Sequence, residues 1–170
     1  RIQNLPHLFG SKDKYIITEK VDGASTSFIL NEKDKYMIGS HNVIKNPENG
    51  SDGGNYYKCN IWAESGSKYN MESVLRDIKK SRKLKTVAIQ GETYGDGIQK
   101  RTYSLKNKHD FVVFHIWFDG VRLPIKDMID VCDKYNLPHV HVYNYNYEIP
   151  DSVEKVIEDV DNSKSHIDGK

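Results

Sequence analysis

The chain has 170 residues, which is enough for one domain with a sizeable core. Its formal net charge of +1 gives no global field that would attract nucleic acid, so any surface that binds nucleic acid must be a local patch. No run of residues is long and apolar enough for a transmembrane helix or a signal peptide, and we expect no membrane partner. The two cysteines, Cys59 and Cys132, fit no metal-ligand spacing. They are expected to be reduced thiols of a cytoplasmic or otherwise intracellular protein.

The hydrophobic pattern predicts a mixture of strands and helices along the chain. Strands are predicted at residues 15–19, 25–30, 36–39, 86–90, 110–118 and 139–145, and helices at 56–64, 71–82, 124–135 and 151–160. Polar, glycine-rich loops are expected at 46–55 and 91–105. Strands outnumber crossover helices and several connections are hairpins, so the pattern favours an antiparallel α+β fold over a doubly wound parallel sheet.

A candidate nucleophile follows the first predicted strand, in the string Lys20-Val21-Asp22-Gly23. A lysine at the edge of a buried strand, next to a carboxylate, can form a covalent intermediate. Only three positions of this Lys-x-Asp-Gly pattern are fixed, so it needs structural context before it indicates a function. The alternatives are an exposed lysine after a strand and a simple β-turn at Asp22-Gly23.

A candidate metal-holding carboxylate, Glu92, comes at the end of the predicted strand near residues 87–92, before the glycine-rich stretch 93–100. A carboxylate in this position can hold a metal-bound water near phosphates. The alternative is a tight hairpin with an exposed glutamate.

Three further features have both a structural and a functional interpretation. The strand 111–117 is aromatic, which is typical of a core strand and also of a platform that stacks on a base. The polar turn Ser40-His41-Asn42 follows another strand. Basic clusters lie at 79–85, where a helix dipole also favours cations, and at 100–109, beside the glycine-rich stretch. The second cluster is the better candidate for a substrate contact.

The order and spacing of these motifs resemble the ATP-dependent RNA ligases of the covalent nucleotidyltransferase superfamily. The matching strings are Lys20 to Ser25, Ser40 to Asn42, Gln90 to Gly95 with Gly97 to Gln99, and Phe111 to Ile116. The opening segment 1–6 resembles the one that precedes the nucleophile in nick-sealing RNA ligases, where an OB module lies N-terminal to this domain. The resemblance covers nearly the whole chain.

The resemblance implies a fold and a domain organisation. Residues 1–170 would form an adenylyltransferase (nucleotidyltransferase) domain with the ATP-grasp-like ligase fold, in which antiparallel sheets are flanked by helices. The chain ends near residues 167–170, where the family continues with two more motifs, so we expect a C-terminally incomplete domain that belongs to a longer chain with other domains.

The resemblance also implies a reaction, its cofactors and its partner. Lysine attacks the α-phosphate of ATP to form lysyl-AMP, AMP passes to an RNA 5′-phosphate, and a 3′-hydroxyl seals the nick. ATP and Mg²⁺ or Mn²⁺ would be needed, with the metal held by Asp22 and Glu92 through water. The implied roles are catalysis by Lys20, Asp22 and Glu92, nucleotide binding by Glu19, Lys20, Gly23, Ser25, Glu92 and Phe114, and contact with the substrate strand by Ser40, His41, Asn42 and Lys100.

Two residues depart from the family pattern. Related enzyme classes also remain as alternatives. His41 stands where arginine is usual, which changes a phosphate or ribose contact because histidine lacks the guanidinium fork. His115 stands where Asp or Asn is common. ATP-dependent DNA ligases and GTP-using capping enzymes commonly place arginine where Ser25 stands, which counts against them. A non-catalytic nucleic-acid-binding remnant of a ligase fold is the remaining alternative.

Overall fold

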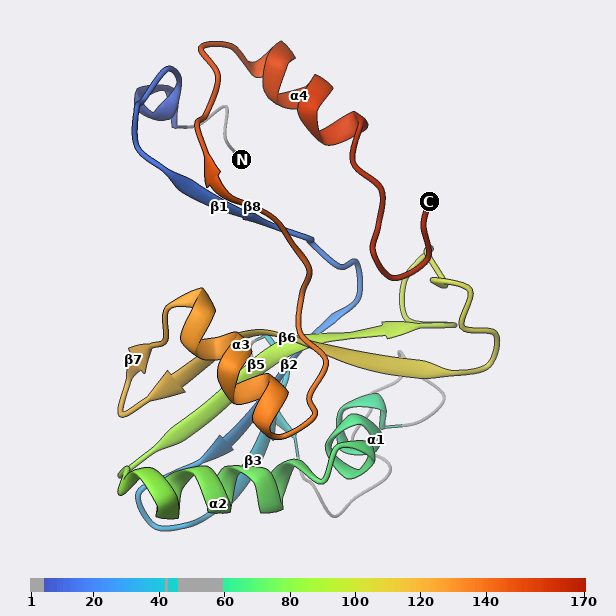
Figure 1. Ribbon diagram of the computed structural model, residues 1–170. Helices are drawn as coiled ribbons and strands as arrows, with labels where there is room; N and C mark the ends of the chain where they lie inside the picture. Colours follow the sequence, from blue (N-terminus) through green and yellow to red (C-terminus); the bar gives the residue numbers. More distant parts are fainter. Residues whose placement is uncertain (1–4, 42, 46–59) are drawn as a thin grey trace. The chain divides into compact units, whose positions relative to one another are not determined.

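The computed structural model describes residues 5–41, 43–45 and 60–170 (Figure 1). The elements are the 3-10 helix η2 (Pro6–Leu8), the strands β1 (Tyr15–Thr18), β2 (Ala24–Leu30), β3 (Tyr36–Gly39), β4 (Ile44–Lys45), β5 (Val87–Gly95), β6 (His109–Phe118), β7 (Val121–Arg122) and β8 (Val142–Tyr147), and the helices α1 (Ile61–Lys68), α2 (Met71–Arg82), α3 (Ile125–Lys134) and α4 (Val153–Asp161). They form two compact units. The first unit contains residues 1–20 and 140–170, and the second contains residues 21–139.

The first unit is built on an antiparallel pair of strands. β1 pairs with β8 in an irregular register that places Tyr15 opposite Tyr147. α4 follows, and Ser152 caps it by accepting a hydrogen bond from the Lys155 N–H over 3.4 Å. Such a cap satisfies one of the four backbone donors that a helix N-terminus leaves without a partner.

The second unit is a six-stranded antiparallel sheet with the order β4-β3-β2-β5-β6-β7. The helices pack on one face of it, and in Figure 1 α2 and α3 lie in front of the strands. On β2 the side chains alternate between buried and half-buried positions, which is the signature of a sheet with one packed face. The largest fully buried side chains of the described residues are Phe28, Leu30, Ile61, Met71, Leu75, Ile78, Val87, Ile89, Phe111, Val113, Ile116 and Met128. The prediction of an antiparallel α+β fold is confirmed.

Several predicted elements differ at their ends. β5 continues through Gly95, so the expected loop from residue 91 was wrong over its first five positions. Gly91 remains in the strand because β2 and β6 pair with it on both sides, which overrides the weak strand propensity of glycine. α1 begins only at Ile61, because Asn60 caps it by accepting from the Ala63 N–H over 3.1 Å. The loop predicted at 46–55 lies outside the described residues.

The cysteine prediction can be examined at one of its two positions. Cys132 is a free, buried thiol of the α3 core, and burial, together with the neighbouring Asp133, raises its pKa to about 12. Cys59 lies outside the described residues. No helix in the described part of the chain is long and apolar enough to cross a bilayer.

Glycine at position 91 is required by close packing. A Cβ there would meet the Val112 carbonyl oxygen at 2.2 Å and the Phe111 ring at 2.3 Å. We expect Gly91→Ala to lower the free energy of unfolding by about 2 kcal/mol or more, as overpacking of a core does. Gly39→Ala is the matched control, because its nearest neighbour would lie at 3.7 Å. Urea unfolding of both variants checks this, and equal stabilities would contradict it.

A half-buried carboxylate links β6 to the end of α1. Asp110 accepts hydrogen bonds from Lys68 Nζ over 2.8 Å, from the Tyr69 hydroxyl, and from the Phe111 N–H over 2.8 Å. Burial favours the neutral acid, but these hydrogen bonds outweigh burial and hold the pKa of Asp110 below its usual value.

The depressed pKa of Asp110 predicts a pH dependence of stability. The contribution of the ionised group is complete above the pKa of an unfolded aspartate, about 3.9, and is lost as the pH falls through the lower folded value. We therefore expect Asp110→Asn to be less stable than the parent at pH 7, and to lose less further stability between about pH 5 and pH 2. Urea unfolding across this range is the measurement, with the exposed Asp127→Asn as control. Parallel pH profiles of parent and Asp110→Asn would contradict the assignment.

Candidate active site

The face of the six-stranded sheet opposite the helices carries a row of polar side chains. Strand alternation places Ser25 and Ser27 of β2 on this face together with Gln90 and Glu92 of β5. Ser25 lies opposite Glu92, and Ser27 lies opposite Gln90. Glu92 therefore lies inside β5, three positions before its end, and the prediction that it terminates a strand was wrong. The two predicted site residues Ser25 and Glu92 are cross-strand neighbours.

The Asp22-Gly23 pair is fixed by contacts with β5 and with the loop that follows it. The Asp22 N–H donates to the Tyr103 hydroxyl over 2.6 Å, and Gln99 Nε2 donates to the Gly23 carbonyl over 3.1 Å. A Cβ at Gly23 would meet the Thr93 carbonyl oxygen at 2.3 Å, so no residue with a side chain fits there without a shift. This pair is thus an anchored turn, and the structure brings it to the strand that carries Glu92.

The loop 96–108 is organised by an aromatic pair that sequence reasoning missed. The Tyr94 and Tyr103 rings meet edge to face with centroids 5.1 Å apart, and both residues are buried. The Arg101 guanidinium lies 4.6 Å from the centroid of the Tyr103 ring. Lys100, predicted to contact the substrate strand, has an exposed side chain on the same loop. The only signal for Tyr103 was one large aromatic residue in an otherwise polar segment.

A β-bulge in β6 sets the position of Phe114. His115 pairs with Gln90 and Val113 pairs with Gly91, so Phe114 is the extra residue between them. Its neighbours Phe111, Val113 and Ile116 belong to the core, whereas Phe114 is half-buried and lies outside that cluster. Its ring meets His115 edge to face at 5.0 Å. The bulge thus interrupts the alternation that would otherwise turn this aromatic residue toward one face.

The polar row continues across β6. The Trp117 indole N–H donates to Gln90 Oε1 over 2.6 Å, and Arg122 Nη1 lies 3.4 Å from His115 Nε2. Burial, with a smaller effect of the Arg122 charge, lowers the pKa of His115, which keeps this imidazole neutral at pH 7. Gln90 was quoted in a motif but given no role, although it lies two positions before Glu92 and strand periodicity places both on one face.

The predicted turn after β3 is described in part. The Ser40 N–H donates to the Val43 carbonyl over 2.8 Å, and His41 is exposed. Gly39 pairs with Ser27, so this turn lies at the end of the sheet that carries Ser25. Asn42 lies outside the described residues.

Two predicted residues belong to the first unit. Lys20 is exposed and is the last residue of the segment that follows β1. The Glu19 N–H donates to the His141 carbonyl over 2.9 Å. The Glu19 carboxylate accepts from the Ser165 hydroxyl and from the His166 N–H, the latter over 3.2 Å.

The donor set of the second unit suits a hard cation that keeps most of its water. Among the described residues, no three or more His, Cys, Asp or Glu side chains gather into a potential ligand cluster. Asp22 is exposed and is followed by Gly23, whose Cβ position would lie 3.0 Å from Glu92 Cγ. Mg²⁺ and Mn²⁺ suit carboxylate and water oxygens, and Mg²⁺ typically binds one or two carboxylates together with waters and substrate phosphates. Asp22 and Glu92 fit this kind of site.

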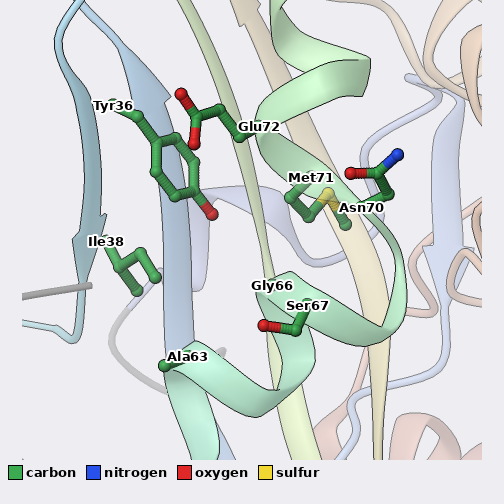
Figure 2. A pocket seen from close by; sticks show the side chains of 8 residues that line it. All are labelled: Tyr36, Ile38, Ala63, Gly66, Ser67, Asn70, Met71 and Glu72. Atoms are coloured by element: carbon green, nitrogen blue, oxygen red, sulfur yellow. The ribbon is translucent and has the colours of Figure 1, made fainter. Parts of the chain in front are cut away.

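A cavity of about 410 Å³ lies elsewhere in the second unit, between β3 and the α1–α2 junction (Figure 2). It is lined by Tyr36, Ile38, Ala63, Gly66, Ser67, Asn70, Met71 and Glu72. None of the predicted site residues lines it. The candidate site is therefore the polar sheet face with its anchored turn.

Comparisons with known proteins agree on a family and a fold. The RNA ligase family profile matches residues 13–168. The chain is similar to an RNA ligase of Naegleria gruberi solved with pyrophosphate, with a TM-score of 0.79 and 20% identity over 99% of this chain and 47% of that one. A variant of that ligase solved with AMP and Mn gives a TM-score of 0.75 and 20% identity over 93% and 45% of the two chains. Another, solved with ATP and Mn, gives 0.74 and 20% over 93% and 45%.

The similarity to the solved ligases establishes the fold and covers part of their length. At about 20% identity this similarity shows the fold, and the chain spans under half the length of the solved ligases. A comparison with curated protein sequences gives no significant match. The family profile covers most of the chain, which therefore belongs to the RNA ligase family.

Proposed function

We propose that residues 1–170 serve as the adenylyltransferase part of an ATP-dependent RNA ligase. The observation that carries this proposal is the anchored turn: the Asp22-Gly23 pair is held against β5, beside Glu92, by Tyr103 and Gln99. A simple solvent-exposed β-turn, the alternative interpretation of Asp22-Gly23, would form without these contacts. The family match and the solved ligases with ATP or AMP and Mn support the same activity.

Lys20 is the proposed nucleophile. Its deprotonated amine attacks the α-phosphorus of ATP, a P–N bond forms, the P–O bond to pyrophosphate breaks, and the amine proton goes to solvent. Lys20 is two residues before Asp22, so the chain alone keeps their Cα atoms within about 7 Å.

Asp22 and Glu92 are the proposed carboxylates of a divalent metal site. A bound Mg²⁺ or Mn²⁺ would supply positive charge beside the α-phosphate as negative charge develops there. The two carboxylates would hold the metal through water, and Ser25 lies opposite Glu92, where its hydroxyl would contact the nucleotide. Gly23, by lacking a side chain, lets the turn approach the sheet.

The remaining predicted residues are assigned to the adenine and to RNA. Phe114, freed from the core by the bulge, is proposed to stack on the adenine, and Glu19 to contact its edge. AMP then passes to an RNA 5′-phosphate, and attack by a 3′-hydroxyl releases AMP and seals the strand. The substrate strand is assigned to Lys100 and to the turn residues Ser40, His41 and Asn42.

The nucleophile can be tested by intact mass after incubation with ATP and Mn²⁺. We expect the parent to gain one AMP and Lys20→Ala to gain none, because only the amine of Lys20 attacks phosphorus. Lys12→Ala, which also removes an exposed lysine of the first unit, should gain AMP like the parent. Covalent AMP on Lys20→Ala would show that the nucleophile is a different residue.

The metal-binding role of Glu92 can be tested by the rate of AMP transfer. Glu92→Gln keeps the size of the side chain and removes its charge, so we expect the rate to fall on the order of a hundredfold. The loss should be smaller at high Mn²⁺ concentration, because added metal offsets weaker binding. Glu154→Gln on α4 is the matched control and should keep the parent rate. A rate for Glu92→Gln within about twofold of the parent would exclude this role.

A further inference from the structure

A surface at the opposite end of the second unit from Glu92 concentrates positive charge. The segments 31–35 and 71–85 contain eight lysines and arginines against four acidic residues, a local excess of four in a chain whose net charge is +1. They meet where Leu30 of β2 pairs with Val87 of β5. Along β5 this point is five residues from Glu92, which corresponds to about 17 Å.

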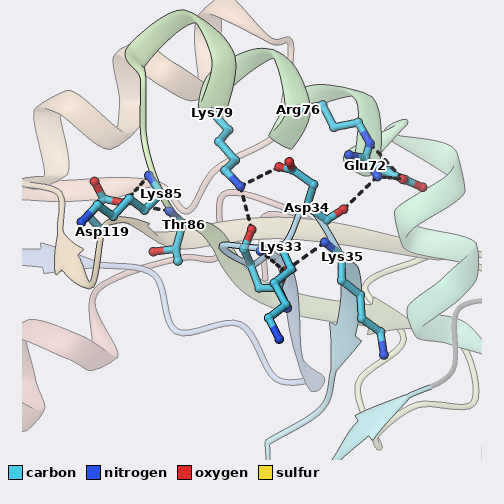
Figure 3. Close-up of polar contacts among 10 residues, drawn as sticks. Lys33, Asp34, Lys35, Glu72, Arg76, Lys79, Lys85, Thr86 and Asp119 are labelled. Carbon is cyan, nitrogen blue, oxygen red and sulfur yellow. Dashed lines mark hydrogen bonds and ion pairs between the residues drawn. The ribbon is translucent and has the colours of Figure 1, made fainter.

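The turn between β2 and β3 is fastened to α2 by two cations (Figure 3). The Lys79 side chain is only 13% exposed, and its Nζ donates to the Asn31 carbonyl over 2.7 Å and to Asp34 Oδ1 over 2.6 Å. Arg76 Nη2 donates to the Asp34 carbonyl over 3.2 Å and to Glu72 Oε1 over 2.6 Å. The Lys79 ammonium lowers the pKa of Asp34, so the Asp34 carboxylate stays ionised near neutral pH.

The turn itself is rigid. Asn31 Oδ1 accepts from the N–H groups of both Lys33 and Lys35, each over 2.9 Å. Asp119 holds the chain after α2 in the same way, accepting from the Lys85 and Thr86 N–H groups over 2.8 and 2.7 Å. These hydrogen bonds fix the backbone that carries the neighbouring cations, so their backbone positions need not reorganise when a ligand binds.

Four lysines remain available on this frame: Lys33, Lys35, Lys80 and Lys83, which we call the basic end. All four are exposed, and within the described part of the chain their ammonium groups have no hydrogen bond or ion pair. Lys80 and Lys83 line a hollow of about 390 Å³ together with Arg76 and Lys79. In Figure 3 the side chains of Lys33 and Lys35 point away from α2.

The helix dipole does not account for this cluster. Cations stabilise the last turn of a helix by interacting with its free carbonyl groups. Lys33 and Lys35 lie on another element, and their placement depends on the Lys79 and Asn31 contacts. Unpaired lysines spaced along a rigid surface suit a ligand with repeated negative charges, and a nucleic-acid backbone is such a ligand.

We propose that the basic end binds the phosphate backbone of the RNA substrate, at a distance from the bond that is sealed. This proposal rests on the proposed RNA ligase function and adds a contact surface to it. A duplex that extends along the strands from Glu92 would bring phosphates to Lys33, Lys35, Lys80 and Lys83. The contact supplies affinity and orientation without reading sequence.

The test is the affinity of the full chain for a nicked RNA duplex at several salt concentrations. Lys33→Gln, Lys35→Gln, Lys80→Gln and Lys83→Gln are combined in one variant, which should fold because the four side chains are exposed and without partners among the described residues. The control combines Lys12→Gln, Lys126→Gln, Lys134→Gln and Lys164→Gln, which change net charge equally at exposed positions elsewhere.

We expect the basic-end variant to bind the duplex roughly tenfold or more weakly at moderate salt. The slope of the logarithm of its binding constant against the logarithm of salt concentration should be shallower by about two to four. The control should stay within about twofold of the parent. Equal losses in both variants, an unchanged basic-end variant, or a parent that does not bind the duplex would each overturn the proposal.

AMP uptake, measured by intact mass on the same samples, separates the two proposals. The adenylation step uses ATP and a divalent metal but no RNA, so AMP uptake should be equal in parent, variant and control. Weaker RNA binding with unchanged AMP uptake supports both proposals. Absence of AMP uptake in the parent would count against the proposed function. The comparison of RNA affinities would still test whether the basic end binds RNA.

Discussion

The close approach of Gly23 to β5 is the constraint on which the candidate site depends. The backbone at this residue lies so near the Thr93 carbonyl that a Cβ would be only 2.3 Å from it. That contact sets the start of β2 in register with β5, which in turn places Ser25 opposite Glu92. Tyr103 and Gln99 then close the loop over the turn. One missing side chain thus brings two distant motifs into contact.

The same sheet serves two purposes because its faces are chemically different. One face packs against three helices and carries the apolar core, including Phe28 and Ile89. The other carries Ser25, Gln90 and Glu92, and the bulge in β6 releases Phe114 from the core. The packed face supplies the rigidity, and the polar face carries residues of the proposed site. A rigid support of this kind holds reactive groups more accurately than a loop does.

Sequence patterns predicted the core elements well and the local geometry of the site poorly. α2 begins and ends where its periodicity indicates, because Met71, Leu75 and Ile78 recur on one face. The pattern failed at Gly91 to Gly95, where pairing on both sides keeps glycine-rich sequence in a strand. Phe114 could not be oriented, because a bulge changes which face a residue occupies. Tyr103 was missed since its partner, the Asp22 N–H, is 81 positions away.

The contacts of Glu19 link the segment after β1 to residues 165 and 166. Its carboxylate already accepts hydrogen bonds from Ser165 and His166, 146 and 147 positions further along. If Glu19 contacts the adenine as proposed, and the nucleotide replaces these donors, its apparent affinity is the intrinsic affinity multiplied by the fraction of molecules in which the carboxylate is available. A change that removes Ser165 and His166 from Glu19 would then raise that affinity. On the proposed role of Glu19, Ser165 and His166 would compete with the nucleotide for this carboxylate.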